Sequence, residues 1–321
     1  MASHLLALVS PRSHGRQRAR GSRRFPAVAF VGALLIGVLA PAAQAGAVLA
    51  DSSVAPDGPG ALSHFDLARK DCLGTARNTT SKVWYTVANG VLSDVYYPTI
   101  DTTNVETLQY IVTDGTSFTD LQTRDMTYTA SSIDPSGMEC RIVSTAKSGK
   151  YRIQTDYVTD PAANTLLMRT SLVPLIAGSY RLYARLDPTV NGNGGGGLGN
   201  GGADSATVDT SRGHPIAVSF DPSRVTNAAN RDYAQPVFMA LDGPLGTVAS
   251  GFAGAASDGL TQLDASHALT AASASATNGN VVQTASIPAA SQGGSFVLAL
   301  GFGSTQAEAV NAAETSLGSG G

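Results

Sequence analysis

The feature that most constrains this fold is a long succession of short β-type segments separated by turn dipeptides. It extends from about Phe65 to about Phe302. "YRIQTDYVTD" and "TLLMRTSLVP" flank the loop "PAAN" and predict a hairpin. The turn dipeptides are Asn89-Gly90, Asp114-Gly115, Asp134-Pro135, Asp242-Gly243, Asp258-Gly259 and Asn278-Gly279. Many strands without intervening helices predict an all-β protein, a large antiparallel β-sandwich.

Further strands and a single helix are predicted along the same stretch. "SYRLYARLDP" is expected to end at Asp187-Pro188, and "HPIAVSF", "PVFMALD", "NVVQTASI" and "SFVLALGFG" continue the series. The one helix is expected in "TQAEAVNAAETSL", where Thr305 and Glu308 have the spacing of a capping box. Its apolar face would hold Val310, Ala313 and Leu317.

The first 45 residues have the pattern of an export signal. A basic segment is followed by an apolar run of 15 residues, Pro26 to Ala40, and by the small-residue sequence "AQA" at Ala43 to Ala45. We therefore predict a signal peptide at 1–45, a flexible lead-in at 46–62 and a secreted, extracellular protein. The alternative for 1–45 is a retained membrane anchor. After cleavage no membrane association is expected.

The net charge of the chain limits the classes of molecule that it is expected to bind. The leader carries six of the 21 basic residues (Arg12, Arg16, Arg18, Arg20, Arg23 and Arg24) and none of the 24 acidic ones, which leaves a net charge of −9 on the remainder. A mildly acidic body argues against nucleic acid or an anionic membrane as a partner.

The carboxylates do not predict a catalytic pair. The chain has four glutamates, Glu106, Glu139, Glu308 and Glu314, of which the last two lie on the predicted helix. Most aspartates stand beside Gly, Pro or Asn, as turn residues do. In "DGTSFTD" Asp114 and Asp120 are better read as a hairpin turn than as a calcium loop, because the alternating acidic ligands are missing. We predict no cofactor and no metal, with calcium in other sheet loops left open.

The aromatic segment "SKVWYTVANGVLSDVYYP", residues 81–98, has two readings, a sugar-binding platform or a buried hairpin. A type I′ turn at Asn89-Gly90 would place Trp84 beside Val95 on one face and Tyr96 beside Val83 on the other. Because the rings are then divided between faces, the pattern favours core packing. If a platform exists, its candidate sugar-stacking rings are Trp84, Tyr85, Tyr96 and Tyr97, of which Trp84 and Tyr97 are selected as site residues.

The two cysteines, Cys72 and Cys140, are too few for a zinc site of their own. In an oxidising compartment they could pair, and the alternative is two separate buried thiols.

Several segments together resemble one known family. They are "GTARNTTSKVWYT", "GVLSDVYYP", "LQYIVTDG", "YVTDPAANTLLMRT", "YRLYARLDP", "ASDGLTQL", "GNVVQTASI" and "LALGFGSTQAEAV". In this order they resemble the N-terminal domain of bacterial glucoamylases and glucodextranases of glycoside hydrolase family 15, called the glucodextranase N domain. The resemblance covers roughly residues 63–317.

The resemblance implies a β-sandwich of the supersandwich type at 63–303 and the start of a linker helix at 304–321. In the family an (α/α)6 barrel with two catalytic glutamates follows, and it releases glucose from α-glucans with inversion. No catalytic residue can be transferred to this sequence. The implied role is an inactive accessory domain that meets α-glucan through its parent enzyme, and the alternative is a carbohydrate-binding module.

The sequence departs from the family pattern at three positions. Cys72 stands where the family tends to have Gly, and Cys140 stands where an aromatic residue is expected. Two atypical cysteines together favour a disulfide between them. Leu260 occupies a position that is often aromatic in relatives, which removes one candidate stacking ring.

Overall fold

The computed structural model describes residues 51–61, 69–192, 204–222, 235–291 and 293–319. The predicted signal peptide, and residues 46–50 and 62 of the predicted lead-in, therefore lie outside the described residues. The strands are β1 (Asp51–Val54), β2 (Cys72–Thr75), β3 (Trp84–Ala88), β4 (Val91–Tyr96), β5 (Thr103–Thr113), β6 (Thr119–Leu121), β7 (Met126–Ser132), β8 (Cys140–Ala146), β9 (Tyr151–Thr159), β10 (Thr165–Pro174), β11 (Arg181–Gly192), β12 (Asp204–Asp209), β13 (Ile216–Asp221), β14 (Val237–Asp242), β15 (Val248–Phe252), β16 (Ser273–Gly279), β17 (Val281–Ser286) and β18 (Gly294–Gly303).

All 18 strands belong to one hydrogen-bonded sheet that folds back on itself, and this confirms the all-β sandwich. Its first half follows the order β2, β3, β4, β5, β11, β17, β15. A single residue pair joins β15 to β16, and the second half continues through β12, β13, β14, β18, β10, β9, β8 and β7. Every pairing is antiparallel except that of β1 with β16.

The core lies between the two halves because most strands alternate inward apolar and outward polar residues. In β10, Leu166, Met168 and Leu172 point into the main apolar cluster, whereas Arg169 is exposed. The predicted hairpin of β9 and β10 is confirmed, with Thr159 opposite Leu166.

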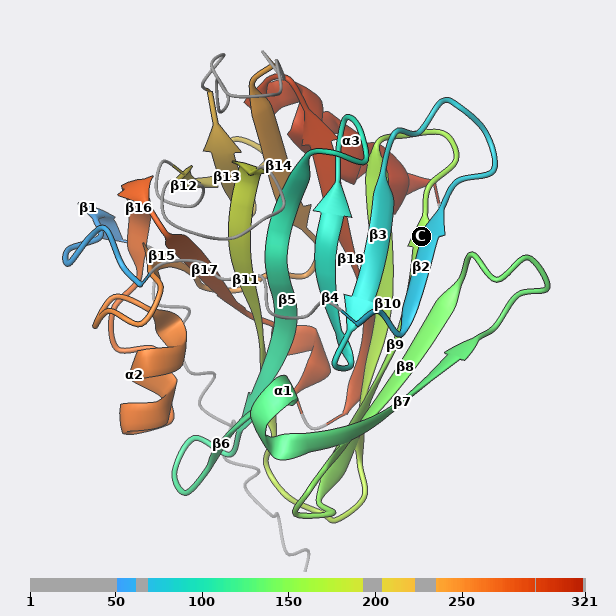
Figure 1. Ribbon diagram of the computed structural model, residues 1–321. Coiled ribbons are helices and arrows are strands. Elements are labelled where there is room, and N and C mark those ends of the chain that lie inside the picture. The colour runs from blue at the N-terminus through green and yellow to red at the C-terminus, as the bar shows by residue number, and fades with distance from the viewer. Residues whose placement is uncertain (1–50, 62–68, 193–203, 223–234, 292, 320–321) are drawn as a thin grey trace, which may run out of the picture. The chain divides into compact units, whose positions relative to one another are not determined.

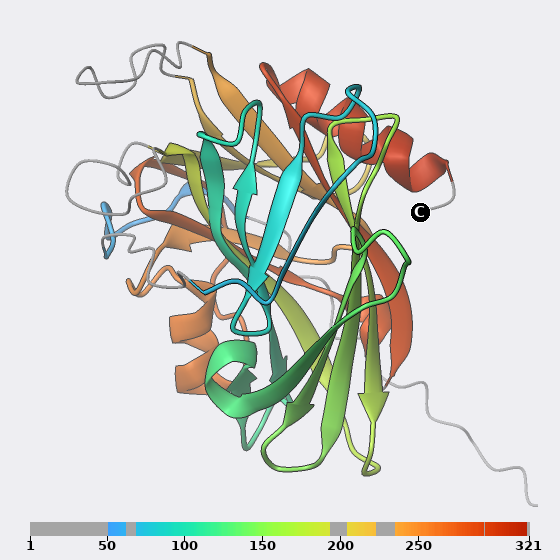
Figure 2. The ribbon, with the colours of Figure 1, turned by 45° about the vertical axis from the view of Figure 1, so that its right-hand side comes forward.

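The helices cover outward faces of the sheet, as Figure 1 and Figure 2 show for α2 (Gly259–Ser266) and α3 (Gln306–Gly318). Under α3, Ile216 and Val218 of β13 form an apolar cluster with Ala309 and Val310 of the helix. The outward face of this part of the sheet is therefore apolar as well, and β13 reads as a continuous apolar run rather than an alternation.

The predicted capping box of α3 is present in a modified form. The Thr305 hydroxyl accepts a hydrogen bond from the Glu308 N–H at 3.2 Å, as expected. The Glu308 carboxylate also accepts from the Ser304 backbone N–H at 2.8 Å and from the Ser304 hydroxyl at 2.7 Å, one residue before the N-cap.

The expectation of a single helix was wrong. A short helix α1 (Gln122–Asp125), α2 and a 3-10 turn η1 (Pro288–Ala290) are also present. Asp258-Gly259 is a typical turn dipeptide, and for this reason the sequence predicts no helix there. In the structure Asp258 is the N-cap residue and accepts from the Leu260 N–H at 2.9 Å.

The predicted end of the strand at Asp187-Pro188 was also wrong. β11 continues to Gly192, and its pairing with β5 shifts register at Pro188. Since a proline lacks an N–H donor, it is tolerated inside a sheet mainly where a bulge interrupts the ladder.

Candidate functional site

The hairpin of β3 and β4 turns as the sequence predicts. Asn89 and Gly90 have φ angles of 51° and 76°, the two positive values that a type I′ turn requires. A Cβ on Gly90 would lie 2.6 Å from the ring of Tyr128 on β7. The turn thus needs glycine both for its backbone conformation and for this close approach.

The register of the hairpin departs from the prediction beyond Thr86. Thr86 faces Ser93 as expected, but Trp84 faces Tyr96 rather than Val95. The extra residue on β4 is accommodated around Asp94, which has a φ of 44°. Asp94 forms an ion pair with Lys70, which also donates a hydrogen bond to the Ser93 hydroxyl at 3.4 Å.

This bulge changes which rings share a face. Cross-strand partners point to the same side of a sheet, so Trp84 and Tyr96 both point outward. Trp84 is 40% exposed and Tyr96 is half-buried, so the prediction that Trp84 packs in the core was wrong. A one-residue bulge was not visible in the pattern, although Asp is among the residues that most readily adopt positive φ.

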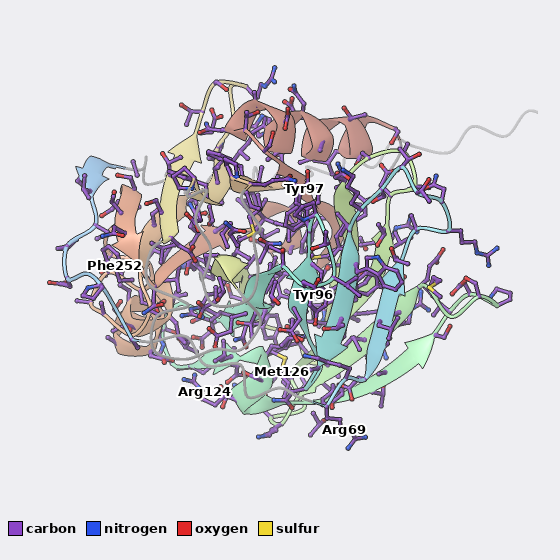
Figure 3. All side chains as sticks on the ribbon, turned by 45° about the horizontal axis from the view of Figure 1, so that its top comes forward. Arg69, Tyr96, Tyr97, Arg124, Met126 and Phe252 are labelled. Carbon is purple, nitrogen blue, oxygen red and sulfur yellow. A yellow bond between two sulfur atoms is a disulfide. The ribbon has the colours of Figure 1, made fainter. Side chains whose placement is uncertain are left out.

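The other two tyrosines of the segment point inward. Tyr85 is fully buried, and Tyr97 stacks on Phe302 with ring centroids 5.4 Å apart. Figure 3 shows Tyr97 near α3 and separate from Tyr96. The structure thus separates Trp84 from Tyr97 and brings Trp84 together with Tyr96.

Charge lies next to the outward rings. The side chains of Lys70 and Asp94 are 25% and 13% exposed, so their ion pair is partly shielded from water. Burial, and then the negative charge of Asp94, raise the pKa of Tyr96 above its ordinary value. Tyr96 is therefore a neutral hydroxyl donor over the physiological pH range.

The sheet has β2 at one end and β8 followed by β7 at the other. We call the place where these two ends meet the seam. Cys72 of β2 and Cys140 of β8 are joined across it by a disulfide. The Tyr85 hydroxyl, on β3, also points across the seam, with the carbonyls of Met138 and Tyr157 at 2.8 Å and 2.9 Å. Within the described residues no backbone ladder joins β2 to β7 or β8, so these side-chain contacts close the sandwich there.

A buried charge cluster joins β11 to α2. The Arg185 guanidinium donates to Asp187 at 2.8 Å and to both carboxylate oxygens of Asp258, at 3.2 Å and 2.8 Å. Burial alone would lower the pKa of Arg185, but the two carboxylates raise it. Burial likewise opposes the charge on Asp258, but Arg185 and two backbone N–H groups hold its pKa below the ordinary range. Asp187 and Asp258 therefore have a structural role, as ion-pair partners of Arg185.

The acidic residues considered for calcium are engaged locally. Asp114 accepts hydrogen bonds from the backbone of Thr116 and Ser117 at 2.8 Å and 2.7 Å, which is the geometry of a turn. Asp120 accepts from the Tyr151 hydroxyl at 2.7 Å. Among the described residues no group of three or more His, Cys, Asp or Glu side chains is arranged to hold a metal ion. The helices in the described part of the chain are too short or too polar to span a membrane.

Comparison with known proteins places this fold. The family model for glucodextranase, domain N, matches residues 55–321. The chain belongs to this family. A glucoamylase of Clostridium sp. (strain G0005) is 39% identical over 142 residues, which are 44% of this chain and 20% of that protein. The crystal structure of a bacterial glucoamylase complexed with acarbose aligns with a TM-score of 0.71 and 31% identity, over 83% of this chain and 36% of the other.

The glucodextranase N domain thus forms only part of each of these relatives. The chain spans one fifth of the curated glucoamylase and about a third of the solved one. For this reason, the match does not assign the activity of these whole enzymes to the 321 residues of this chain.

Proposed function

We propose that this chain is the accessory N-terminal domain of a secreted glucoamylase-type hydrolase that degrades α-glucans. The observation that carries the proposal is the family match across residues 55–321, together with the structural similarity to a bacterial glucoamylase. The pattern of residues 1–45 supports export. The role of the domain is structural, to support the linker and the catalytic barrel of its parent enzyme.

The arrangement of side chains supports an inactive domain. Glu308 caps α3, and Glu314 forms an ion pair with Arg212 at 3.2 Å. Asp187 and Asp258 are committed to Arg185. Hydrolysis of a glycosidic bond generally needs two carboxyl groups on either side of the sugar, with at least one free to exchange a proton. These four carboxylates already have structural partners.

The test is glucose release from maltooligosaccharides by the purified 321-residue chain. We expect none above a buffer control, and measurable glucose formation would overturn the proposal. A second test reads the coding DNA beyond codon 321. A continuation, in frame or frameshifted, that is rich in helix-forming residues and glutamate is expected, and unrelated sequence there would count against the proposal.

The second candidate function is a carbohydrate-binding module. One observation favours it, the outward Trp84 beside Tyr96. Because this concerns a specific surface, it is developed in the next subsection.

A further inference from the structure

A row of side chains crosses the outer face of the sheet at the hairpin. Thr75 of β2 faces Trp84, Trp84 faces Tyr96, and Tyr96 faces Thr103 of β5. We call these four residues the aromatic row. Leu73, two residues before Thr75 on the same face, is 49% exposed. The row exists only because the bulge at Asp94 turns Tyr96 outward.

The aromatic row combines the two kinds of group that a sugar needs. Exposed rings offer an apolar surface on which the C–H face of a pyranose can stack, and Tyr keeps a polar end for hydrogen bonding. The Lys70 and Asp94 ion pair lies next to Tyr96 and offers both a donor and an acceptor to sugar hydroxyls. Cross-strand side chains stand roughly 5 Å apart, which lets one ligand contact both rings.

Size and charge argue against a protein as the partner. A stable protein interface needs about 800 Å² on each side and some 20–30 residues. Here the apolar groups are two exposed side chains, Leu73 and Trp84, and one half-buried ring. Thr103 at the end of the row is buried, as are Thr86 and Ser93 in the neighbouring row. Lys70 and Asp94 neutralise each other, which suits an uncharged ligand better than an acidic or basic peptide.

We propose that the aromatic row, with Trp84 and Tyr96 as stacking rings and the Lys70–Asp94 pair as a polar contact, is a binding site for uncharged α-glucan chains. The choice of α-glucan rests on the proposed function. The site lies on the domain itself, and it holds polymeric substrate independently of the catalytic barrel.

The chain provides its own probe, because Trp84 is its only tryptophan. Maltoheptaose titrated into the full chain is expected to change the Trp84 fluorescence in a saturable way. A Kd near 1 mM corresponds to about −4 kcal/mol, so titration to about 10 mM reaches near saturation. No change over this range would overturn the proposal.

Variants locate the site by calorimetry or by retardation in starch-containing gels, with circular dichroism as the check of folding. Trp84→Thr and Tyr96→Ser should each weaken maltoheptaose binding about tenfold, which equals about 1.4 kcal/mol. Tyr128→Ala removes a ring of similar exposure (38%) on β7 and should bind as the parent does. Equal weakening by Tyr128→Ala, or undiminished binding by a folded Trp84→Thr, would contradict the assignment.

The class of ligand is tested separately with cellohexaose. Weaker binding than to maltoheptaose supports the α-glucan assignment, and equal or tighter binding would overturn it. Spectral changes of Trp84 that depend on protein concentration instead of sugar would indicate self-association and would also overturn it. These results are distinct from those on the proposed function, which concern glucose release and the downstream coding sequence.

Discussion

At the residue scale, Arg185 is the clearest case of a charged group whose removal should destabilise the domain. Arg185→Leu leaves Asp187 and Asp258 as buried, unpaired carboxylates. We expect a loss of about 3–5 kcal/mol in the free energy of unfolding, measured by urea denaturation.

Arg124 provides the matched control. It also pairs with two aspartates, Asp125 and Asp264, but its side chain is 43% exposed. Arg124→Leu should therefore cost at most about 1 kcal/mol. Similar losses for the two variants would show that the burial of Arg185 does not determine how much it contributes to the free energy of unfolding.

Asp204 leads to a prediction about pH. It is 4% exposed and accepts a hydrogen bond from the Val190 N–H at 3.0 Å. Burial first, and then the charges of Asp221 and Asp187, raise its pKa well above the ordinary value. The folded state thus binds a proton that the unfolded chain releases above about pH 4, so this group lowers stability progressively as the pH rises.

Asp204→Asn removes that titration and can still accept from Val190. Its melting temperature relative to the parent should therefore increase from about pH 5 to about pH 8, as followed by thermal denaturation. The exposed Asp264→Asn serves as the control for removing one surface carboxylate. A difference for Asp204→Asn that stays constant or shrinks with pH would refute the argument.

At the scale of single elements, α3 depends on the glycines beneath it. A Cβ on Gly301 of β18 would lie 2.4 Å from the Ala309 carbonyl oxygen and 2.5 Å from the Ala313 nitrogen. Both are backbone atoms of the helix, so Gly301→Ala must displace α3. We expect a loss of about 1–3 kcal/mol and faster amide exchange in residues 306–318.

Gly318, near the end of the same helix, has nothing within 4 Å of its Cβ position. Gly318→Ala should leave both measurements close to those of the parent protein. Unchanged amide exchange in Gly301→Ala would mean that the sheet adjusts while the helix stays in place.

The same scale shows how far the sequence predicts elements. Strands with regular alternation, such as β9 and β10, and the type I′ turn at Asn89-Gly90 are predicted because local pattern determines them. α2 was missed because its first residues, Asp258 and Gly259, suit a turn as well as a helix start. Its stability comes from the distant Arg185 and from Leu263 packing on Ile111 and Tyr183.

The shared outward face of Trp84 and Tyr96 was not predicted, for a related reason. The rings of residues 84–97 were recognised, but their faces depend on one inserted residue at Asp94. Asp94 is held in place by Lys70, which lies before β2 and so outside the hairpin in sequence. A contact between residues this far apart does not appear in the alternation of apolar and polar residues, so the sequence pattern does not predict it.

At the scale of the whole molecule, the disulfide joins the two ends of the sheet. Cys72 and Cys140 are 68 residues apart. In the chain-entropy description a loop of this length stabilises the folded state by about 4 kcal/mol. Cys72→Ser with Cys140→Ser should lower the free energy of unfolding by that order, measured in urea at equal protein concentration.

Thiol titration checks the assumption behind this prediction. The unfolded, unreduced parent should show no free thiol, and two should appear after reduction. Detection of both thiols without reduction would remove the disulfide and with it the expected loss of stability. The serine variant should also expose Trp84 to quenchers no more than the parent does, because Trp84 already points to the outer face of the sheet.

The position of β18 has a consequence for synthesis of the chain. This strand, Gly294–Gly303, lies between β10 and β14, and it is the last strand in sequence. Until it leaves the ribosome, β10 and β14 each keep an open edge, and such edges invite pairing with other chains. The sandwich therefore cannot be completed until nearly the whole domain has been synthesised. Nascent chains shorter than about 303 residues expose these strand edges, and they are the forms most in need of a chaperone.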